Sequence, residues 1–191
     1  MIYDLPKTVD IDGTAHEIRY DFRVILEILE MLSDPDLESS DKGEALLHMF
    51  YVLPEEISNI ERAIISCYEF IDAGKAQKKK QPRLIDWEHD FNYIIAPVNR
   101  VLGYESRAVE YDIEHNSGGL HWWTFLSAYM EIGSDCLLSQ IVAIRDKLAR
   151  HKQLEKHERE WLRRNRHLVD LPQKYSAEDE ELLKQWTKEV K

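Results

Sequence analysis

The sequence predicts a mainly α-helical, multi-helix bundle-like fold with a small β-hairpin near the N-terminus. Six or seven stretches of the chain repeat apolar residues at the three- and four-residue spacing of an amphipathic helix. Only one pair of short runs, within residues 8–18, alternates in the manner of strands. The 191 residues include 43% hydrophobic and 10% aromatic residues, too many for a disordered chain, and they are too scattered for a membrane span.

Residues 8–18 form the predicted hairpin. Two alternating runs flank Asp12-Gly13, a pair typical of the type I′ turn because both of its central residues need a positive φ angle. Asp10, Asp12 and Gly13 also match the start of a calcium-binding loop, but the later ligands and the closing Glu are missing. We therefore favour a structural turn over a calcium site.

Three helices are expected between the hairpin and Ile71. Asp21 is a suitable N-cap for the first, which ends near Ser33. The second begins near Asp41 and stops before Pro54, which suits the first turn of the third helix. This third helix has the clearest amphipathic stripe, with acidic residues on its other side. Its expected core residues are Ile57, Ile60, Ile64, Cys67, Tyr68 and Ile71, and its expected outer residues are Glu55, Glu56, Glu61, Arg62 and Glu69.

The chain is expected to divide into four parts. They are an acidic hairpin-plus-helix subdomain (1–73), a basic linker or loop (74–83), a second helical subdomain (84–171) and a C-terminal tail helix (172–191). The linker holds four lysines and no large apolar residue, so it cannot contribute to a core. The tail starts with a capping pattern at Ser176 and offers only a few apolar residues for packing.

The second subdomain should contain helices over residues 86–103, 120–130, 134–150 and 154–166. Asp86 can cap the first of these, and Pro97 should kink or break it. The segment from Tyr104 to Gly119 should be irregular. The helix that contains Trp122 and Trp123 is apolar on nearly every side, so we expect it to be central, with both indoles in the core rather than stacked on a ligand.

The acidic charge is concentrated at the N-terminal end. The first 70 residues contain 16 acidic and 5 basic residues, whereas the remaining residues contain 20 of each. A field of this sign opposes binding of the first part to DNA or to membranes, and it favours a basic protein partner.

The beginning of the chain and its two cysteines indicate a reducing compartment. Residues 1–6 lack a basic region followed by an apolar run, so no secretory signal is expected and the cytoplasm is the expected location. Cys67 and Cys136 are isolated in apolar surroundings, with no CxxC motif. We expect both to be buried free thiols.

No pattern typical of an enzyme is present, and neither a cofactor nor a metal is expected. The chain lacks HExxH, GxSxG and GxGxxG. Asp112, Glu114, His115 and His121 could meet at a cation if the glycine turn between them folds back, but no helical spacing holds them together. A capping role for His121 is the favoured alternative.

Two further patterns each have a functional and a structural interpretation. Asp86 and Asp90 have the spacing of an acid–base pair on one helix face, although carboxylates at a helix start more simply favour the helix dipole. The stretch from Arg145 to His167 has nine basic and four acidic residues around Trp161, which could indicate nucleic-acid contact. Acidic residues interspersed among these bases weaken that hypothesis.

The order of these features resembles a family of tailed-bacteriophage proteins called Gp-fifteen. The resemblance spans most of the chain and is more distinctive in the second half. It is carried by Ile85-Asp86-Trp87-Glu88-His89-Asp90, Leu120-His121-Trp122-Trp123-Thr124-Phe125, Ile141-Val142-Ala143-Ile144-Arg145 and Glu158-Arg159-Glu160-Trp161-Leu162.

The resemblance implies a non-enzymatic role in the assembly of long phage tails, in the cytoplasm of the bacterial host. The implied partners are phage tail proteins, above all the tape-measure protein, for which this protein would act as a chaperone. A homo-oligomer is also possible, and nucleic acid is the alternative partner. We expect partner contacts on the helical faces between Asp21 and Ile71 and on the basic segment. The named candidates are Glu55, Glu56, Glu61, Arg145, Arg159, Trp161, Arg163 and Arg164.

Overall fold

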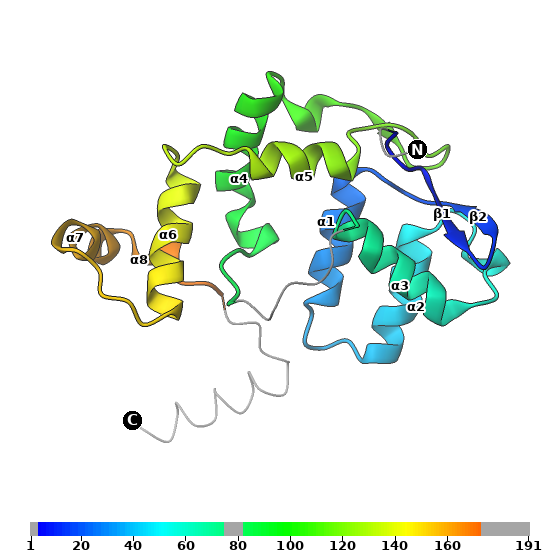
Figure 1. Ribbon diagram of the computed structural model, residues 1–191, viewed down its shortest axis with the longest axis horizontal. Coiled ribbons are helices and arrows are strands. Elements are labelled where there is room, and N and C mark those ends of the chain that lie inside the picture. Colours follow the sequence, from blue (N-terminus) through cyan, green and yellow to red (C-terminus); the bar gives the residue numbers. More distant parts are fainter. Residues whose placement is uncertain (1–3, 75–81, 173–191) are drawn as a thin grey trace.

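The structure is a computed structural model that describes residues 4–74 and 82–172. Within these residues the chain is mainly helical, with helices α1–α8, one hairpin and one short β-ribbon (Figure 1). The predicted fold class is therefore confirmed. The lysine cluster of the predicted linker and the predicted helix that begins at Ser176 lie outside the described residues.

The predicted hairpin forms from β1 (Thr8–Ile11) and β2 (Thr14–Glu17). Asp12 and Gly13 have φ angles of 54° and 86°, the positive values that a type I′ turn requires. The Gly13 backbone N–H donates to the Asp10 carboxylate at 3.1 Å, so this side chain closes the turn.

The first helical group consists of α1 (Phe22–Leu32), α2 (Ser39–Phe50), the 3₁₀ turn η1 (Pro54–Glu56) and α3 (Ile60–Ile71). Asp21 caps α1 as expected, since its carboxylate accepts from the Arg23 N–H at 3.0 Å. The predicted start of the third helix at Pro54 is wrong. Ile57 is extended and ends the 3₁₀ turn, and the Asn59 side chain caps α3 by accepting from the Arg62 N–H at 3.1 Å.

The second helical group begins with α4 (Trp87–Leu102), which continues through Pro97. The predicted break is therefore absent. Pro97 is buried, and so are Ile94, Ile95 and Val98 of the same helix. The burial of these apolar residues offsets the roughly 3 kcal/mol that an internal proline costs a helix. The elements that follow are η2 (Ser106–Ala108), β3 (Tyr111–Asp112), β4 (Ser117–Gly118), α5 (Trp122–Met130), α6 (Leu137–Ala149), α7 (Lys156–Arg164) and α8 (Arg166–Val169).

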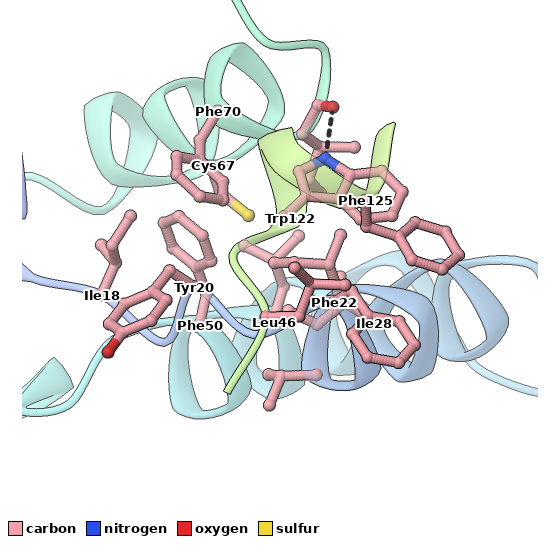
Figure 2. Close-up of a cluster of buried hydrophobic side chains, with 14 of the residues drawn as sticks. Ile18, Tyr20, Phe22, Ile28, Leu46, Phe50, Cys67, Phe70, Trp122 and Phe125 are labelled. Carbon is pink, nitrogen blue, oxygen red and sulfur yellow. Dashed lines mark hydrogen bonds between the residues drawn. The ribbon is translucent and has the colours of Figure 1, made fainter. Parts of the chain in front are cut away.

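The central core joins both helical groups. Figure 2 shows the aromatic side chains of α1, α2, α3 and α5 gathered in one cluster. The Phe22 ring stacks on Phe125, with centroids 4.6 Å apart. The Trp122 indole N–H donates to the Ile71 carbonyl oxygen at 2.8 Å, the dashed contact in Figure 2. The expected core position of Trp122 is confirmed, and it links residues on either side of the predicted linker.

The start of α1 is also hydrogen-bonded to the start of α5. The Phe22 N–H donates to the Leu120 carbonyl at 3.0 Å, and the Trp122 N–H donates to the Tyr20 carbonyl at 2.7 Å. The buried Asp21 carboxylate accepts from the Leu120 N–H at 2.8 Å. The two helical groups therefore share this junction and the central core. Their division into two subdomains remains a prediction.

Two smaller expectations also have an outcome in the described residues. Cys67 is buried, and burial raises the pKa of its thiol, whereas Cys136 is half-buried and caps α6. Both are free thiols, but the prediction of full burial is confirmed only for Cys67. None of the described helices is both long and apolar enough to cross a bilayer.

Candidate functional site

A groove of about 630 Å³ lies between α2, η1 and α3. Leu47 from α2 and Ile64 from α3 give it an apolar lining, and Ile60 is 49% exposed at the N-terminal end of α3. Gly43 has no side chain to narrow the groove from the α2 side. A Cβ atom at this position would meet only the tip of Ile64, at 3.6 Å. The lining residues are Ser39, Ser40, Gly43, Glu44, Leu47, His48, Pro54, Glu55, Ile60 and Ile64.

The groove carries an acidic rim, which we define as Glu44, Glu55, Glu56 and Glu61. Glu44 and Glu55 line the groove itself, Glu56 follows in η1, and Glu61 lies in the first turn of α3. All four are exposed, and none forms an ion pair within residues 4–74 and 82–172. Their charges are therefore available to a partner, and three of them are predicted partner-binding residues.

The helix that forms one wall is held by buried contacts. The Tyr51 hydroxyl donates to the Ala63 carbonyl in α3 at 2.8 Å, and Ile57 is buried just before the helix. The Asn59 side-chain amide donates to the Asp12 carboxylate in the hairpin turn at 2.7 Å. The groove is thus a preformed feature of packed elements, which lowers the entropy cost of binding.

The apolar stripe of α3 is turned further toward solvent than the sequence pattern indicated. Cys67 and Ile71 are buried as expected, but Ile60 and Tyr68 are 49% and 42% exposed. Phe70 takes the core position instead, stacked on the Trp123 ring at 5.6 Å. Part of the stripe assigned to the core therefore lies on the surface beside the groove.

These exposed apolar residues are the part of the site that the sequence did not reveal. The exposed Ile60 and Tyr68 lie at four-residue spacing on either side of the half-buried Ile64 of α3, and Leu53, before η1, is 48% exposed. The signal available in the sequence was that the apolar stripe of α3 is wider than the side of a helix that one core can cover. Single exposed apolar side chains are ordinary, but a row of them beside an apolar groove marks a binding surface.

The basic segment is not one helix, and Arg145 is not on its surface. The segment divides among α6, α7 and the start of α8, and Arg145 in α6 is only 5% exposed. Arg159, Arg163 and Arg164 are exposed on α7, and Trp161 between them is half-buried. The structure thus brings Arg159, Arg163 and Arg164 together and separates them from Arg145.

Arg145 instead forms a buried ion pair with Asp90 of α4. Two parallel hydrogen bonds of 2.6 and 3.0 Å run from the guanidinium to the carboxylate. The remaining N–H groups donate to the carbonyls of Leu84, Leu168 and Val169, at 2.7 to 2.9 Å. Arg145 therefore fastens α8 and the entry to α4 onto α6, a structural role that leaves none of its donors for phosphate.

The two carboxylates at the start of α4 also have structural roles. Burial alone would raise the pKa of Asp90, but hydrogen bonds from Arg145, the Asp86 backbone and His89 hold it below its usual value. Asp86 caps α4 by accepting from the His89 N–H at 2.9 Å. The hypothesis of an acid–base pair is not supported, because Asp90 is sequestered by Arg145.

The four candidate cation ligands do not converge. His115 contacts Asp112 at 2.7 Å on the exposed β3–β4 turn, whereas His121 is buried at the start of α5. His121 accepts from the Trp123 N–H through Nδ1 and donates from Nε2 to the Pro6 carbonyl at 2.9 Å. Both ring nitrogens are thus occupied, and the expected capping role is confirmed. No group of three metal-binding side chains occurs among the described residues.

Comparison with known proteins identifies one family. The family model described as Bacteriophage Gp15 protein matches residues 1–171, almost the whole chain, and confirms the resemblance inferred from the sequence. No curated protein matches the chain, and no solved structure does.

Proposed function

We propose that this chain, which belongs to the bacteriophage Gp15 protein family, is a non-enzymatic tail-assembly chaperone that binds a helix of a tape-measure protein. The observation that carries the proposal is the groove between α2 and α3, with its apolar lining and its unpaired acidic rim. Family membership supports a phage protein, and the groove supports protein binding. We further propose that the client is a tape-measure protein and that this protein acts as its chaperone in the cytoplasm of the bacterial host.

The shape of the groove favours a helix as its occupant. A channel between two packed helices accepts the apolar stripe of a third, whose anchors recur at three and four residues. Leu47 and Ile64 would meet such anchors, and Ile60 and Leu53 would extend the contact to the edge. Basic residues beside the client's stripe would pair with the acidic rim, so charge selects the orientation of the client and its rate of association.

The balance of apolar and acidic surface fits a temporary partner. Exposed apolar side chains cover the client's own stripe, which would otherwise drive its aggregation before the tail forms. The excess negative charge of the first 70 residues keeps the loaded complexes soluble by repelling like surfaces. A groove with an open side also lets the client leave during assembly.

Co-expression with the tape-measure protein tests the proposal. A rim variant with Glu55→Lys, Glu56→Lys and Glu61→Lys should reduce the soluble fraction of the client several-fold, because like charges would then oppose its basic flanks. Circular dichroism of the isolated variant should match the wild type, since these side chains are exposed and form no ion pair among the described residues.

A matched control carries the same change of charge elsewhere. Glu110, Glu114 and Glu131 are exposed and lie outside the groove, so their replacement by Lys should leave the client as soluble as with the wild type. The proposal fails if both variants behave alike, or if the tape-measure protein is equally soluble without this protein.

A further inference from the structure

The outward side of α7 is a basic surface without internal partners. Lys156, Arg159, Arg163 and Arg164 are exposed, and none forms an ion pair within the described part of the chain. We call these four residues the basic face of α7. The only acidic side chain that α7 exposes beside these four cations is that of Glu160. Unpaired cations of this density on one short helix are available for an external anionic partner.

Glu158, the other acidic residue of α7, points to a different contact. Its carboxylate accepts from the Lys147 ammonium of α6 at 2.5 Å, and it also accepts from the Glu155 backbone N–H at 2.8 Å. The bond from Lys147 ties the inner side of α7 to α6, so the basic face is turned outward, and the bond from the Glu155 N–H caps α7 itself. The helix is therefore presented to solvent in a defined orientation.

The basic face and the acidic rim cannot meet within one chain. Figure 1 is drawn with the longest axis horizontal, and α7 lies at the left end of it while α2 and α3 lie toward the right. α4, α5 and α6 stand between them. Two complementary unpaired surfaces at opposite ends of one molecule can pair only between copies.

We propose that the groove between α2 and α3 receives α7 from a second copy of this chain when no client helix occupies it. The guanidinium groups of Arg159, Arg163 and Arg164 would form hydrogen-bonded ion pairs with the carboxylates of the acidic rim. The aliphatic stems of these arginines, together with the edge of Trp161, would cover Ile60 at the mouth of the groove.

The contact has a head-to-tail geometry. The surface used by one copy differs from the surface used by the other, so each bound copy still offers a free groove at one end and a free α7 at the other. Such a contact continues to further copies unless the rotation between them closes a ring. The acidic halves of successive copies do not face each other in this arrangement, which avoids their mutual repulsion.

Salt controls an interface of this kind. Raising the ionic strength from about 0.02 M to about 0.5 M shortens the range of charge interactions from roughly 20 Å to roughly 4 Å. Exposed ion pairs weaken accordingly, and the apolar contact around Ile60 is small. We therefore expect association that is reversible, dependent on concentration and lost at high salt.

A charge-swap experiment with the full chain tests this inference by sedimentation velocity at low ionic strength. The first variant is the rim variant described above. The second variant, Arg159→Glu, Arg163→Glu and Arg164→Glu, makes the basic face acidic. Each variant alone should sediment as a monomer, because its two surfaces then carry the same charge. An equimolar mixture should associate again, because every surface of one variant then meets an opposite charge on the other.

Recovery in the mixture also shows that both variants are folded. The control variant at Glu110, Glu114 and Glu131 should associate as the wild type does. The inference is overturned if the wild type stays monomeric at all concentrations, if either variant associates as strongly as the wild type, or if the mixture remains monomeric. The experiment contains no client protein, so its failure leaves the proposed chaperone function to be judged by its own assay.

Discussion

Arg145 and Asp90 occupy an interior position where an unpaired charge is costly. Arg145→Met would leave the Asp90 carboxylate buried without its cation, and it would also free the carbonyls of Leu84 and Leu168. We expect a loss of about 3–5 kcal/mol in the free energy of unfolding, measured by urea denaturation. The double variant Arg145→Met with Asp90→Asn should recover part of this loss. An Arg145→Met protein as stable as the wild type would show that the pair does not hold α8.

The same pair predicts an acid dependence. The pKa of Asp90 is lowered in the folded protein, so its contribution to stability is present above the unfolded pKa of about 3.9 and is lost as the pH falls through the folded value. Stability should therefore decline below about pH 4, and Asp90→Asn should make the decline shallower. Parallel pH profiles of the two proteins would contradict the account.

Trp122 and Phe125 anchor the central core at the residue scale. Both are nearly inaccessible, and Trp122 also donates a hydrogen bond to α3. Trp122→Ala or Phe125→Ala should lower the free energy of unfolding by about 3–5 kcal/mol, as measured by thermal or urea denaturation. Wild-type melting temperatures for both variants would place these side chains outside the core.

Two substitutions at Gly43 in α2 distinguish an effect on the stability of the helix from an effect on the shape of the groove. Gly43→Ala should stabilise the protein by about 0.5–1 kcal/mol, because alanine favours helix and its Cβ meets only Ile64. Gly43→Leu should also fold but should fill the groove and weaken client binding at least tenfold, as measured by titration calorimetry. Equal affinity of the Ala and Leu variants would show that the groove is not the binding site.

At the level of elements, the sequence correctly predicted the turn and the helix starts that depend on neighbouring residues. Asp12-Gly13 specified the hairpin turn, and Asp21 and Asp86 marked two helix starts that the structure confirms. The orientation of α3 depends on packing against other helices, so local pattern gave the wrong answer there. The helix α4 also continues without a break through Pro97, where local pattern predicted a kink or a break. Tertiary packing outweighed propensity in each case.

The candidate site shows the same limit more strongly. Three of the four acidic residues of the rim, Glu55, Glu56 and Glu61, could be named from the sequence because charge is visible in composition, whereas the groove depends on the spacing between α2 and α3. The role of Arg145 was missed because its partner, Asp90, lies 55 residues away, and a basic residue in a basic segment looks exposed. Pairings across such a separation have no periodic signature in one sequence.

Considered as a whole molecule, the protein has one main core that draws on both predicted subdomains. Trp122 and Phe125 from the second helical group pack with Phe22 and Ile71 from the first. We therefore expect one cooperative unfolding transition across these groups, with equal calorimetric and van't Hoff enthalpies. Two separate calorimetric transitions would instead support independent subdomains.

The central claim is that a helix of the tape-measure protein occupies the groove between α2 and α3. Site-specific photocrosslinking tests it most directly, with the reactive group placed at Ile60 beside the groove and, as control, at Ile113, which is 55% exposed on the β3–β4 turn. The account predicts an efficient crosslink to the tape-measure protein from position 60, lost on adding the Gly43→Leu substitution, and little from position 113. Equal crosslinking from both positions, or none from position 60, would contradict it.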